Sequence, residues 1–340
     1  MDKLSKRKRQ MVKRKFLYFD LALLAVLTIE VPFSLYYGEV VIPFTEFGHG
    51  TYAFIIDEIR IPTVIASAAV GVVLAVAGVL MQSAFRNYLA DPYISGTASG
   101  GAFGAVLGYF VALWFPAVDL FLAQQALAFA FSVLATLATL ALGKRSRGPY
   151  GVLVAGVLIS YLFSALITIA VQYFSSVYPG VKPVDFWLFG EVYVVGYSRA
   201  LITLTVALLI TVFALKSSKL VDLIAVSDEL AYPHGFDPDR FRLVLLLASS
   251  LAVSVVVSNF GVIGFVGLMV PNLVRMISPV GTKDAVLQSL LLSPVIMILG
   301  DDISRNFFGQ ILPLTAVTSL MAFPVFVYYF AVKGSADIRA

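Results

Sequence analysis

The chain has 340 residues, of which 60% are hydrophobic and only 13% are charged, and its mean hydropathy is +0.93. Soluble domains average roughly 45–50% apolar and about 25% charged residues. This composition therefore excludes a water-soluble monomer and predicts an integral membrane protein. The chain has no cysteine and two histidines, which excludes disulfides, thiolate metal sites and thiol nucleophiles and argues against a histidine metal cage.

The first element in chain order is a basic tail. Residues 1–15 carry eight Lys or Arg and one acid. We interpret them as a cytoplasmic tail that faces the lipid surface and fixes the topology. The alternatives are a nucleic-acid-binding arm and the start of a signal peptide. The apolar stretch that follows is too long for a signal peptide and has no small-residue cleavage site after it, and we expect no nucleic-acid partner.

Apolar segments then recur along the chain, most of them close to the ~20 residues that span a hydrocarbon core. They predict an all-α integral membrane protein with ten transmembrane helices. These helices form one domain over residues 16–332, followed by a short tail at 333–340. The expected spans are 16–37, 61–83, 94–114, 120–142, 150–174, 199–215, 241–259, 262–278, 285–300 and 313–332.

The distribution of charge supports ten spans and an orientation. With the N-terminus inside, the inner segments hold 20 of the 24 Lys and Arg, and the outer segments hold 4, whereas the acids divide 10 and 10. This asymmetry follows the positive-inside rule and predicts that both termini are cytoplasmic in a plasma (inner) membrane. Two longer loops are expected: an acidic, aromatic one outside at 38–60, and an amphipathic one inside at 216–240 that forms short helices at the membrane face.

Small residues repeat in the segment 94–114. A helix with glycine at every fourth position has a groove along one face, where a second helix can approach backbone to backbone. We interpret this stripe as a tight packing surface rather than a ligand site. Its members are Gly96, Gly100, Gly104 and Gly108.

A polar stripe runs along the segment 150–174, at Ser160, Ser164, Thr168 and Gln172. Steps of four residues drift only about 40° on a helix of 3.6 residues per turn, so the four side chains share one slowly turning face. In lipid such a face should meet protein or water, which predicts the lining of a translocation path. The alternative is that the hydroxyls bond back to their own helix and the amide lies at a packing interface.

Several chemistries are unsupported by the sequence. The chain lacks the G-x-x-x-x-G-K-[ST] phosphate loop and the H-E-x-x-H zinc motif. Asp301 and Asp302 are adjacent, so their side chains diverge and cannot share a proton as a catalytic pair does. The intramembrane acids Asp20 and Glu30 lie near the ends of their span, which disfavours an ion-coupled transporter. An ion-coupled secondary transporter and a membrane-embedded enzyme remain the alternatives to a transporter that is driven from outside this chain.

Seven short blocks occur in order along the chain and with consistent spacing. They are I-R-I-P at 59–62, G-V-L-M-Q-S-A-F-R-N-Y-L-A-D-P at 78–92, W-L-F-G at 187–190, A-x-x-x-G at 231–235, G-V-I-G-F-V-G-L-M-V-P at 261–271, D-x-x-x-R at 301–305, and the L-P and F-P pairs at 312–313 and 323–324. Together they resemble the signature of the FecCD-like permeases, and the resemblance covers about residues 55–330. These permeases are the membrane subunits of ATP-binding-cassette (ABC) importers for ferric siderophores, haem and vitamin B12.

The resemblance implies a ten-helix permease bundle of the vitamin B12 importer type, without a cofactor or a bound metal. It implies a homodimer that works with two cytoplasmic ABC ATPases and an external substrate-binding protein. The path would be lined largely by the fifth and tenth helices, which agrees with the polar stripe. The ATPases would grip the loop 216–240 at Ala231, His234 and Gly235. The expected solute is a metal chelate, ferric siderophore first, with haem, vitamin B12 or molybdate also possible.

Arg60 and Arg305 are two of the four basic residues on the predicted outer face. We expect them to project outward and bind carboxylates of the binding protein, because the planar guanidinium group pairs with carboxylate in a bidentate way. The alternative is a pair within the chain, to Glu58 or Asp57 for Arg60 and to Asp301 for Arg305. The chain departs from the family pattern at Thr63, Tyr88, His234, Val262 and Asn272.

Overall fold

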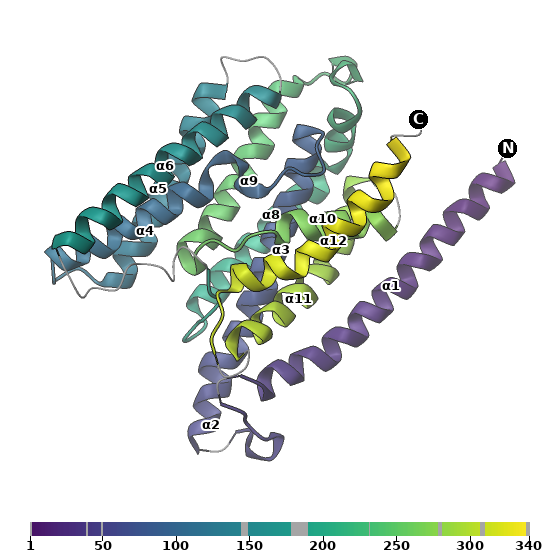
Figure 1. Cartoon of the computed structure of the whole chain (residues 1–340). Coiled ribbons are helices and arrows are strands. Elements are labelled where there is room, and N and C mark those ends of the chain that lie inside the picture. Colours follow the sequence, from purple (N-terminus) through teal and green to yellow (C-terminus); the bar gives the residue numbers. More distant parts are fainter. Residues whose placement is uncertain are drawn as a thin grey trace.

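The computed structural model describes residues 2–38, 40–48, 50–143, 149–177, 190–230, 232–277, 281–306 and 310–337. Over these ranges the protein is a bundle of helices (Figure 1). Eight helices are long and apolar enough to cross a membrane, and two shorter apolar helices, α10 and α12, accompany them. These helices are α1 (Asp2–Tyr36), α3 (Ile61–Phe85), α4 (Thr97–Trp114), α5 (Leu120–Gly143), α6 (Pro149–Val177), α8 (Ser198–Val226), α9 (Pro238–Phe260), α10 (Val266–Ile277), α11 (Thr282–Arg305) and α12 (Leu314–Asp337).

The ten expected apolar segments each coincide with one of these helices, which confirms the predicted all-α membrane fold. Several helices continue beyond their apolar parts. The basic tail is helical and continuous with α1. Helix α8 continues to Val226 and α9 begins at Pro238, so the predicted loop boundaries at 216 and 240 lie inside helices. The connection itself spans residues 227–237 and contains two short 3₁₀ helices, η4 (Asp228–Leu230) and η5 (Tyr232–His234).

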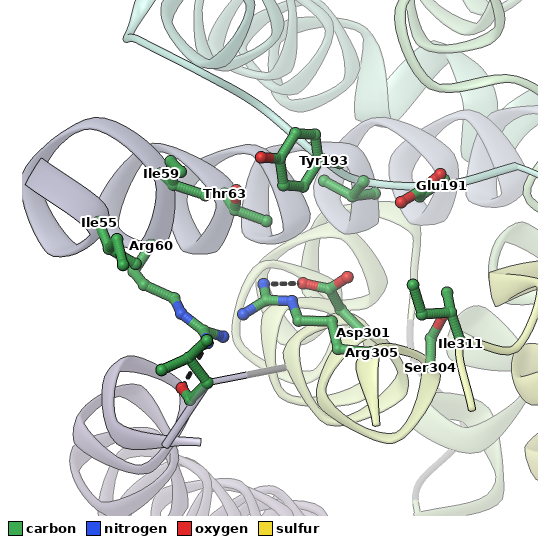
Figure 2. A pocket seen from close by; sticks show the side chains of 12 residues that line it. Ile55, Ile59, Arg60, Thr63, Glu191, Tyr193, Asp301, Ser304, Arg305 and Ile311 are labelled. Carbon is green, nitrogen blue, oxygen red and sulfur yellow. Dashed lines mark hydrogen bonds and ion pairs between the residues drawn. The ribbon is translucent and has the colours of Figure 1, made fainter. Parts of the chain in front are cut away.

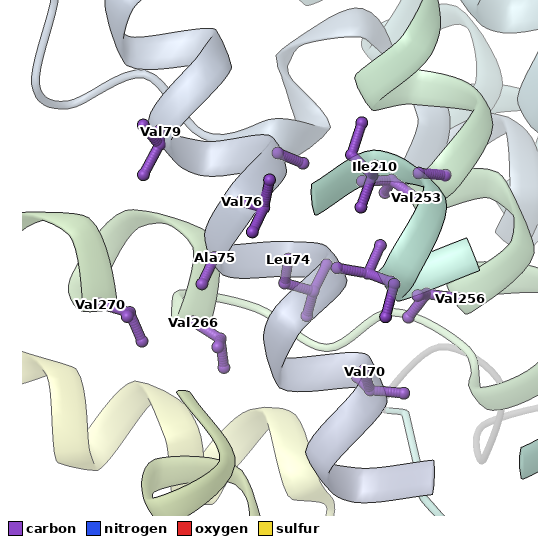
Figure 3. Packing of buried hydrophobic residues seen from close by; sticks show 14 of the residues in the cluster. Val70, Leu74, Ala75, Val76, Val79, Ile210, Val253, Val256, Val266 and Val270 are labelled. Atoms are coloured by element: carbon purple, nitrogen blue, oxygen red, sulfur yellow. The ribbon is translucent and has the colours of Figure 1, made fainter. Parts of the chain in front are cut away.

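Helix α3 is the centre of the bundle and packs against α8, α9, α10 and α11. Its side chains are mostly Val, Ala and Leu, and 83% of its most apolar window is buried. Figure 3 shows Val70, Leu74 and Val76 of α3 packed among valines and isoleucines of the neighbouring helices. By contrast, α1 lies along one side of the bundle, mainly against α11 (Figure 1), with 11% of its span buried.

The helix of α3 begins earlier than its apolar part. Residues Gly50–Phe85 form one continuous helical stretch of 36 residues. It consists of α2 (Gly50–Phe54), a π-helical turn η2 (Ile55–Arg60) and α3 itself. Half of the predicted outer loop is therefore helical. A π turn widens the helix by one residue per turn and is common at functional sites.

Glycines allow the helices to approach closely. A Cβ at Gly104 or Gly108 would meet the backbone of α5, which confirms that the glycine stripe of α4 is a packing surface. On α3, a Cβ at Gly71 would lie 2.7 Å from the Ser293 carbonyl oxygen of α11. At Gly78 it would overlap the carbonyl oxygen of Gly267 in α10. Helix α3 is thus held backbone to backbone by two neighbours.

We expect Gly78→Ala to destabilise the fold strongly. The clash is with backbone, which cannot rotate away, so we expect a cost at or above the upper end of the ~1–3 kcal/mol usual for overpacking. The measurement is the thermal unfolding midpoint of the detergent-purified protein. Gly264→Ala is the matched control, because its nearest neighbour would be a Thr315 methyl group at an ordinary 3.4 Å. A Gly78→Ala midpoint equal to that of the unsubstituted protein would contradict this packing.

Candidate functional sites

A pocket of about 150 Å³ opens at the end of the bundle where α2 lies. We call it the Arg60–Arg305 pocket. It lies between the π turn at the start of α3, the end of α11 and the segment 190–195 (Figure 2). Its lining combines two guanidinium groups, two carboxylates and apolar side chains. The lining residues are Val40, Ile55, Ile59, Arg60, Thr63, Glu191, Val192, Tyr193, Asp301, Ser304, Arg305 and Ile311.

Arg60 reaches the pocket from the last position of the π turn and is only 5% exposed. Its guanidinium group donates to the carbonyl oxygens of Tyr37, at 2.6 Å, and of Val40, at 3.1 Å. It lies directly against Gly38, where a side chain would overlap it. Arg60 therefore fastens the loop that follows α1 to the start of α3 through two backbone carbonyl groups. The alternative pair of Arg60 with Glu58 or Asp57 stays a prediction.

Arg305 forms an ion pair with Asp301, one turn earlier on α11, and lies 3.8 Å from a carboxylate oxygen of Asp302. The pair within the chain that we gave as the alternative is therefore present. It is buried rather than exposed: the side chain of Arg305 is 14% exposed and that of Asp301 is 4% exposed. Ser67 of α3 donates to Asp301 at 3.1 Å, and Ser34 of α1 donates to Asp302 at 2.6 Å. The cluster joins three helices at this end of the bundle.

The formal charges in the lining of the pocket balance, because the guanidinium groups of Arg60 and Arg305 are matched by the carboxylates of Glu191 and Asp301. Both guanidinium groups already have partners within the chain, so an incoming carboxylate would have to share them with Asp301 and with the carbonyl groups around Arg60. Thr63, where the chain departs from the family pattern, also lines the pocket; it is 2% exposed, and its hydroxyl group accepts from the Val194 amide at 3.4 Å. The docking role of Arg60 and Arg305 stays a prediction.

The polar stripe of α6 lies on the part of that helix that the rest of the chain leaves uncovered. Ser164, Thr168 and Gln172 are exposed and Ser160 is half-buried. The Thr168 hydroxyl group donates to the Ser164 carbonyl oxygen at 3.0 Å, as the back-bonding alternative expects. Helical periodicity divides the uncovered face into two halves. One holds the polar stripe, and the other is apolar, at Leu158, Leu162, Ile169 and Tyr173.

The connection 227–237, which we call the 227–237 segment, lies at the opposite end of the bundle from α2 (Figure 1). Its tip, from Tyr232 to Gly235, is exposed. Gly235 has φ of +80°, and an added Cβ would meet nothing within 4 Å. His234 is exposed within η5, and Ala231 lies outside the described residues. The tip is therefore exposed on the surface, where a partner could reach it.

Charged residues at the base of this segment form a cluster that the sequence did not reveal. Asp228 accepts from Arg86, which follows α3, and from Arg242, in the first turns of α9. Burial alone would raise the pKa of the Asp228 carboxyl group, but hydrogen bonds and charges from Arg242 and Arg86 together hold it below its usual range. Arg86 lies 142 positions from Asp228 along the chain, and Arg242 lies 14 positions from it. No local sequence pattern therefore marks this cluster.

Two of the family departures contact each other. Asn272 of α10 donates to the Tyr88 carbonyl oxygen at 2.8 Å. Arg275 lies over the Tyr88 ring, 4.7 Å from its centre, and also binds the side-chain oxygen of Gln82. The loop that follows α3 is thereby held to α10, and the residue changes at 88 and 272 form one structural unit.

The bundle and its sites define a multi-pass membrane permease. The chain belongs to the FecCD transport family, whose model matches residues 22–332. It is 32% identical over 275 residues to the vitamin B12 import permease BtuC of Vibrio cholerae, covering 80% of this chain and 81% of that one. It is 32% identical over 287 residues to a probable iron chelatin permease of Helicobacter pylori, covering 83% and 84%. A solved inward-facing transporter assigned to the metal-chelate ABC type matches with a TM-score of 0.81 and 26% identity, over 92% of this chain and 99% of that one.

Proposed function

We propose that this permease forms a homodimer that moves a metal-chelate solute inward, powered by two cytoplasmic ABC ATPases and supplied by an external binding protein. The observation that carries the proposal is the separation of two surfaces at opposite ends of one bundle. The Arg60–Arg305 pocket lies at one end and the exposed 227–237 segment at the other. With the basic tail in the cytoplasm, the pocket faces outward and the segment faces the ATPases.

The binding protein would dock at the Arg60–Arg305 pocket. Arginine suits this role because its planar group pairs with carboxylate in two parallel hydrogen bonds. The two subunits of a homodimer would present two pockets, one for each lobe of a binding protein. The ATPases would grip the 227–237 segment at His234, Gly235 and Ala231. Rigid-body movement of this segment would open and close the path.

The solute is proposed to be a metal chelate, with ferric siderophore first and haem, vitamin B12 or molybdate as alternatives. The support comes from relatives named for an iron chelate and for vitamin B12, and from a structural neighbour of the metal-chelate type. An ion-coupled secondary transporter is the alternative mechanism. It would transport without any ATPase.

Native mass spectrometry of the complex purified from its own membrane tests this assembly. We expect two permease chains with two ATPase chains, and one binding protein when its solute is present. Mass analysis of the small molecule released from that binding protein identifies the solute. A permease that purifies reproducibly without any ATPase would contradict the proposal, and a released molecule without a metal would contradict the solute class.

The polar stripe of α6 gives a second expected result. If Ser160, Ser164, Thr168 and Gln172 line a path on a two-fold axis, each residue faces its own copy across the gap. Single cysteines at these positions should therefore cross-link between subunits, in a pattern that changes with nucleotide. Cysteines at Leu162 and Ile169, on the apolar half of the same uncovered face, should not. Equal cross-linking on both halves would mean that the stripe does not mark the path.

A further inference from the structure

The cluster at the base of the 227–237 segment joins four elements through named contacts. We call it the Asp228 cluster; it comprises Arg86, Asp228 and Arg242. The Nε group of Arg86 donates to the Ile224 carbonyl oxygen of α8 at 2.7 Å. The Nε group of Arg242 donates to the Ala84 carbonyl oxygen of α3 at 3.0 Å. Because both arginines also bind Asp228, the segment is tied directly to the last turn of α3.

The residue at the end of α3 is in an unusual backbone conformation. Arg86 caps the helix with φ of +51° and ψ of +35°, in the left-handed region that glycine usually occupies after a helix. A side chain there costs energy. Only Arg86 among the cluster residues has this conformation, and it aims the guanidinium group at both Ile224 and Asp228. A glycine would close the helix equally well, so the arginine is explained by its contacts with the segment.

Helix α3 connects this cluster to the pocket at the other end of the bundle. The continuous stretch Gly50–Phe85 is 36 residues long, or about 54 Å at 1.5 Å per residue. Arg60 and Thr63 near its start line the Arg60–Arg305 pocket, and Arg86 follows its end. Backbone contacts at Gly71 and Gly78 hold the middle of α3 against α11 and α10. If α3 moves as one rigid element with these neighbours, a displacement at the Asp228 cluster reaches the pocket.

We propose that the Asp228 cluster and α3 form an allosteric link, through which the position of the 227–237 segment sets the shape of the Arg60–Arg305 pocket. The proposal rests on the proposed function, in which an ATPase moves that segment. Nucleotide binding at the ATPase shifts Asp228, Asp228 pulls Arg86 and Arg242, and α3 carries the shift to Arg60 and Thr63. Linkage makes the coupling reciprocal: docking at the pocket changes the affinity of the ATPase for nucleotide by the same factor.

A cysteine in the pocket reports this link without a binding protein. Tyr193 lines the pocket and is 51% exposed, and Tyr193→Cys introduces the chain's only cysteine. The rate of labelling by a small impermeant maleimide is measured on the permease–ATPase complex in nanodiscs, with and without a non-hydrolysable ATP analogue. We expect nucleotide to change the rate by about fivefold or more, the lower end of usual allosteric coupling.

Two variants should remove or weaken the response without removing the fold. Asp228→Asn weakens both ion pairs and leaves Arg242 its contacts with Ala84 and Asp239. Arg86→Gly removes the contacts of Arg86 with Ile224 and Asp228, leaves the connection from Asp228 through Arg242 to Ala84, and relieves the strained backbone. The dependence of the labelling rate on nucleotide should be lost in Asp228→Asn and weakened in Arg86→Gly, while the rate without nucleotide and the amount of bound ATPase stay unchanged in both.

Asp237→Asn is the matched control. Asp237 lies in the same segment and caps α9 through the Asp239 amide at 3.0 Å, but it has no part in the cluster, and asparagine is an equally good cap. This control should keep the full nucleotide response. An unchanged response in both Asp228→Asn and Arg86→Gly, or a nucleotide-independent rate in the Tyr193→Cys background, would overturn the link alone. If no ATPase associates with the permease at all, both the proposed function and the link are overturned.

Discussion

Replacing Gly235 by tryptophan should abolish ATP-driven uptake while the permease still folds. Within the chain an added Cβ at this position meets nothing within 4 Å, so the indole ring has room. The cost inside the chain is the left-handed backbone, about 1–2 kcal/mol for a residue with a side chain. Against an ATPase surface the same ring would block close approach. We expect uptake by whole cells to fall more than about tenfold, which corresponds to about 1.4 kcal/mol of lost partner binding.

Gly48 offers a matched control for this substitution. It has the same φ of +80° and the same empty surroundings, but it lies in the loop before α2, at the other end of the bundle. Gly48→Trp therefore carries the same backbone strain without touching the 227–237 segment, and its complex should retain the ATPase. Gly235→Asn, a small residue that tolerates left-handed backbone, should keep uptake. Equal ATPase retention and uptake by both tryptophan variants would contradict the assigned coupling site.

Reversing the charge of Arg305 should have the second large effect, and this effect is on the fold. The substitution Arg305→Glu places a third carboxylate beside Asp301 and Asp302, both of which are buried. Breaking a buried ion pair by removing one partner costs about 3–5 kcal/mol, and the new like charge adds to this. We expect a large fall in the thermal unfolding midpoint of the purified protein and a loss of folded protein in the membrane.

Arg240→Glu is the control for a charge reversal. Its side chain is 87% exposed and pairs with Asp237 at 3.3 Å, and exposed pairs of this kind contribute about 0–1 kcal/mol. Its unfolding midpoint should stay close to that of the unsubstituted protein. If Arg305→Glu is no more destabilising than Arg240→Glu, the buried pair is not holding α11, and the original expectation of an outward-facing Arg305 gains support. Any measurement of binding-protein docking by an Arg305 variant should therefore be accompanied by the unfolding midpoint of that variant.

The sequence predicts the helices well because lipid leaves few alternatives. Lipid offers no hydrogen-bond partners, so a transmembrane segment must pair its backbone N–H and C=O groups within itself, and long apolar runs therefore form helices. The glycine stripe of α4 is present as expected, and the i,i+4 pair of Asp301 with Arg305, which the sequence offered as the alternative to docking, is also present. The polar stripe of α6 is likewise found on one uncovered face.

Charged residues caused the errors in the helix boundaries. Asp57, Glu58 and Arg60 make residues 38–60 look like a loop, yet residues 50–60 continue the helix of α3. Lys216 and Lys219 end the apolar run of α8, but the helix continues to Val226. A hydropathy pattern detects the apolar part of a helix that lies in the membrane core, and it does not detect the polar turns by which the same helix continues beyond that core.

The electrostatic sites depend on contacts between distant parts of the chain. Arg86 and Asp228 meet only because α3 and α8 end side by side. The burial of Arg60 follows from carbonyl groups of the loop after α1. A docking arginine and a structural arginine look alike in a sequence, because the difference between them is whether other segments of the chain already occupy the guanidinium group.

Reconstitution into proteoliposomes tests the central claim most directly. The purified permease is inserted with its ATPase, the binding protein is placed outside loaded with its labelled solute, and ATP is enclosed inside. Uptake should require both ATP and the binding protein, and it should persist when a protonophore and sodium-free buffer remove the ion gradients. Uptake by the permease alone, driven by a proton or sodium gradient and indifferent to ATP, would contradict an ABC importer and favour an ion-coupled transporter.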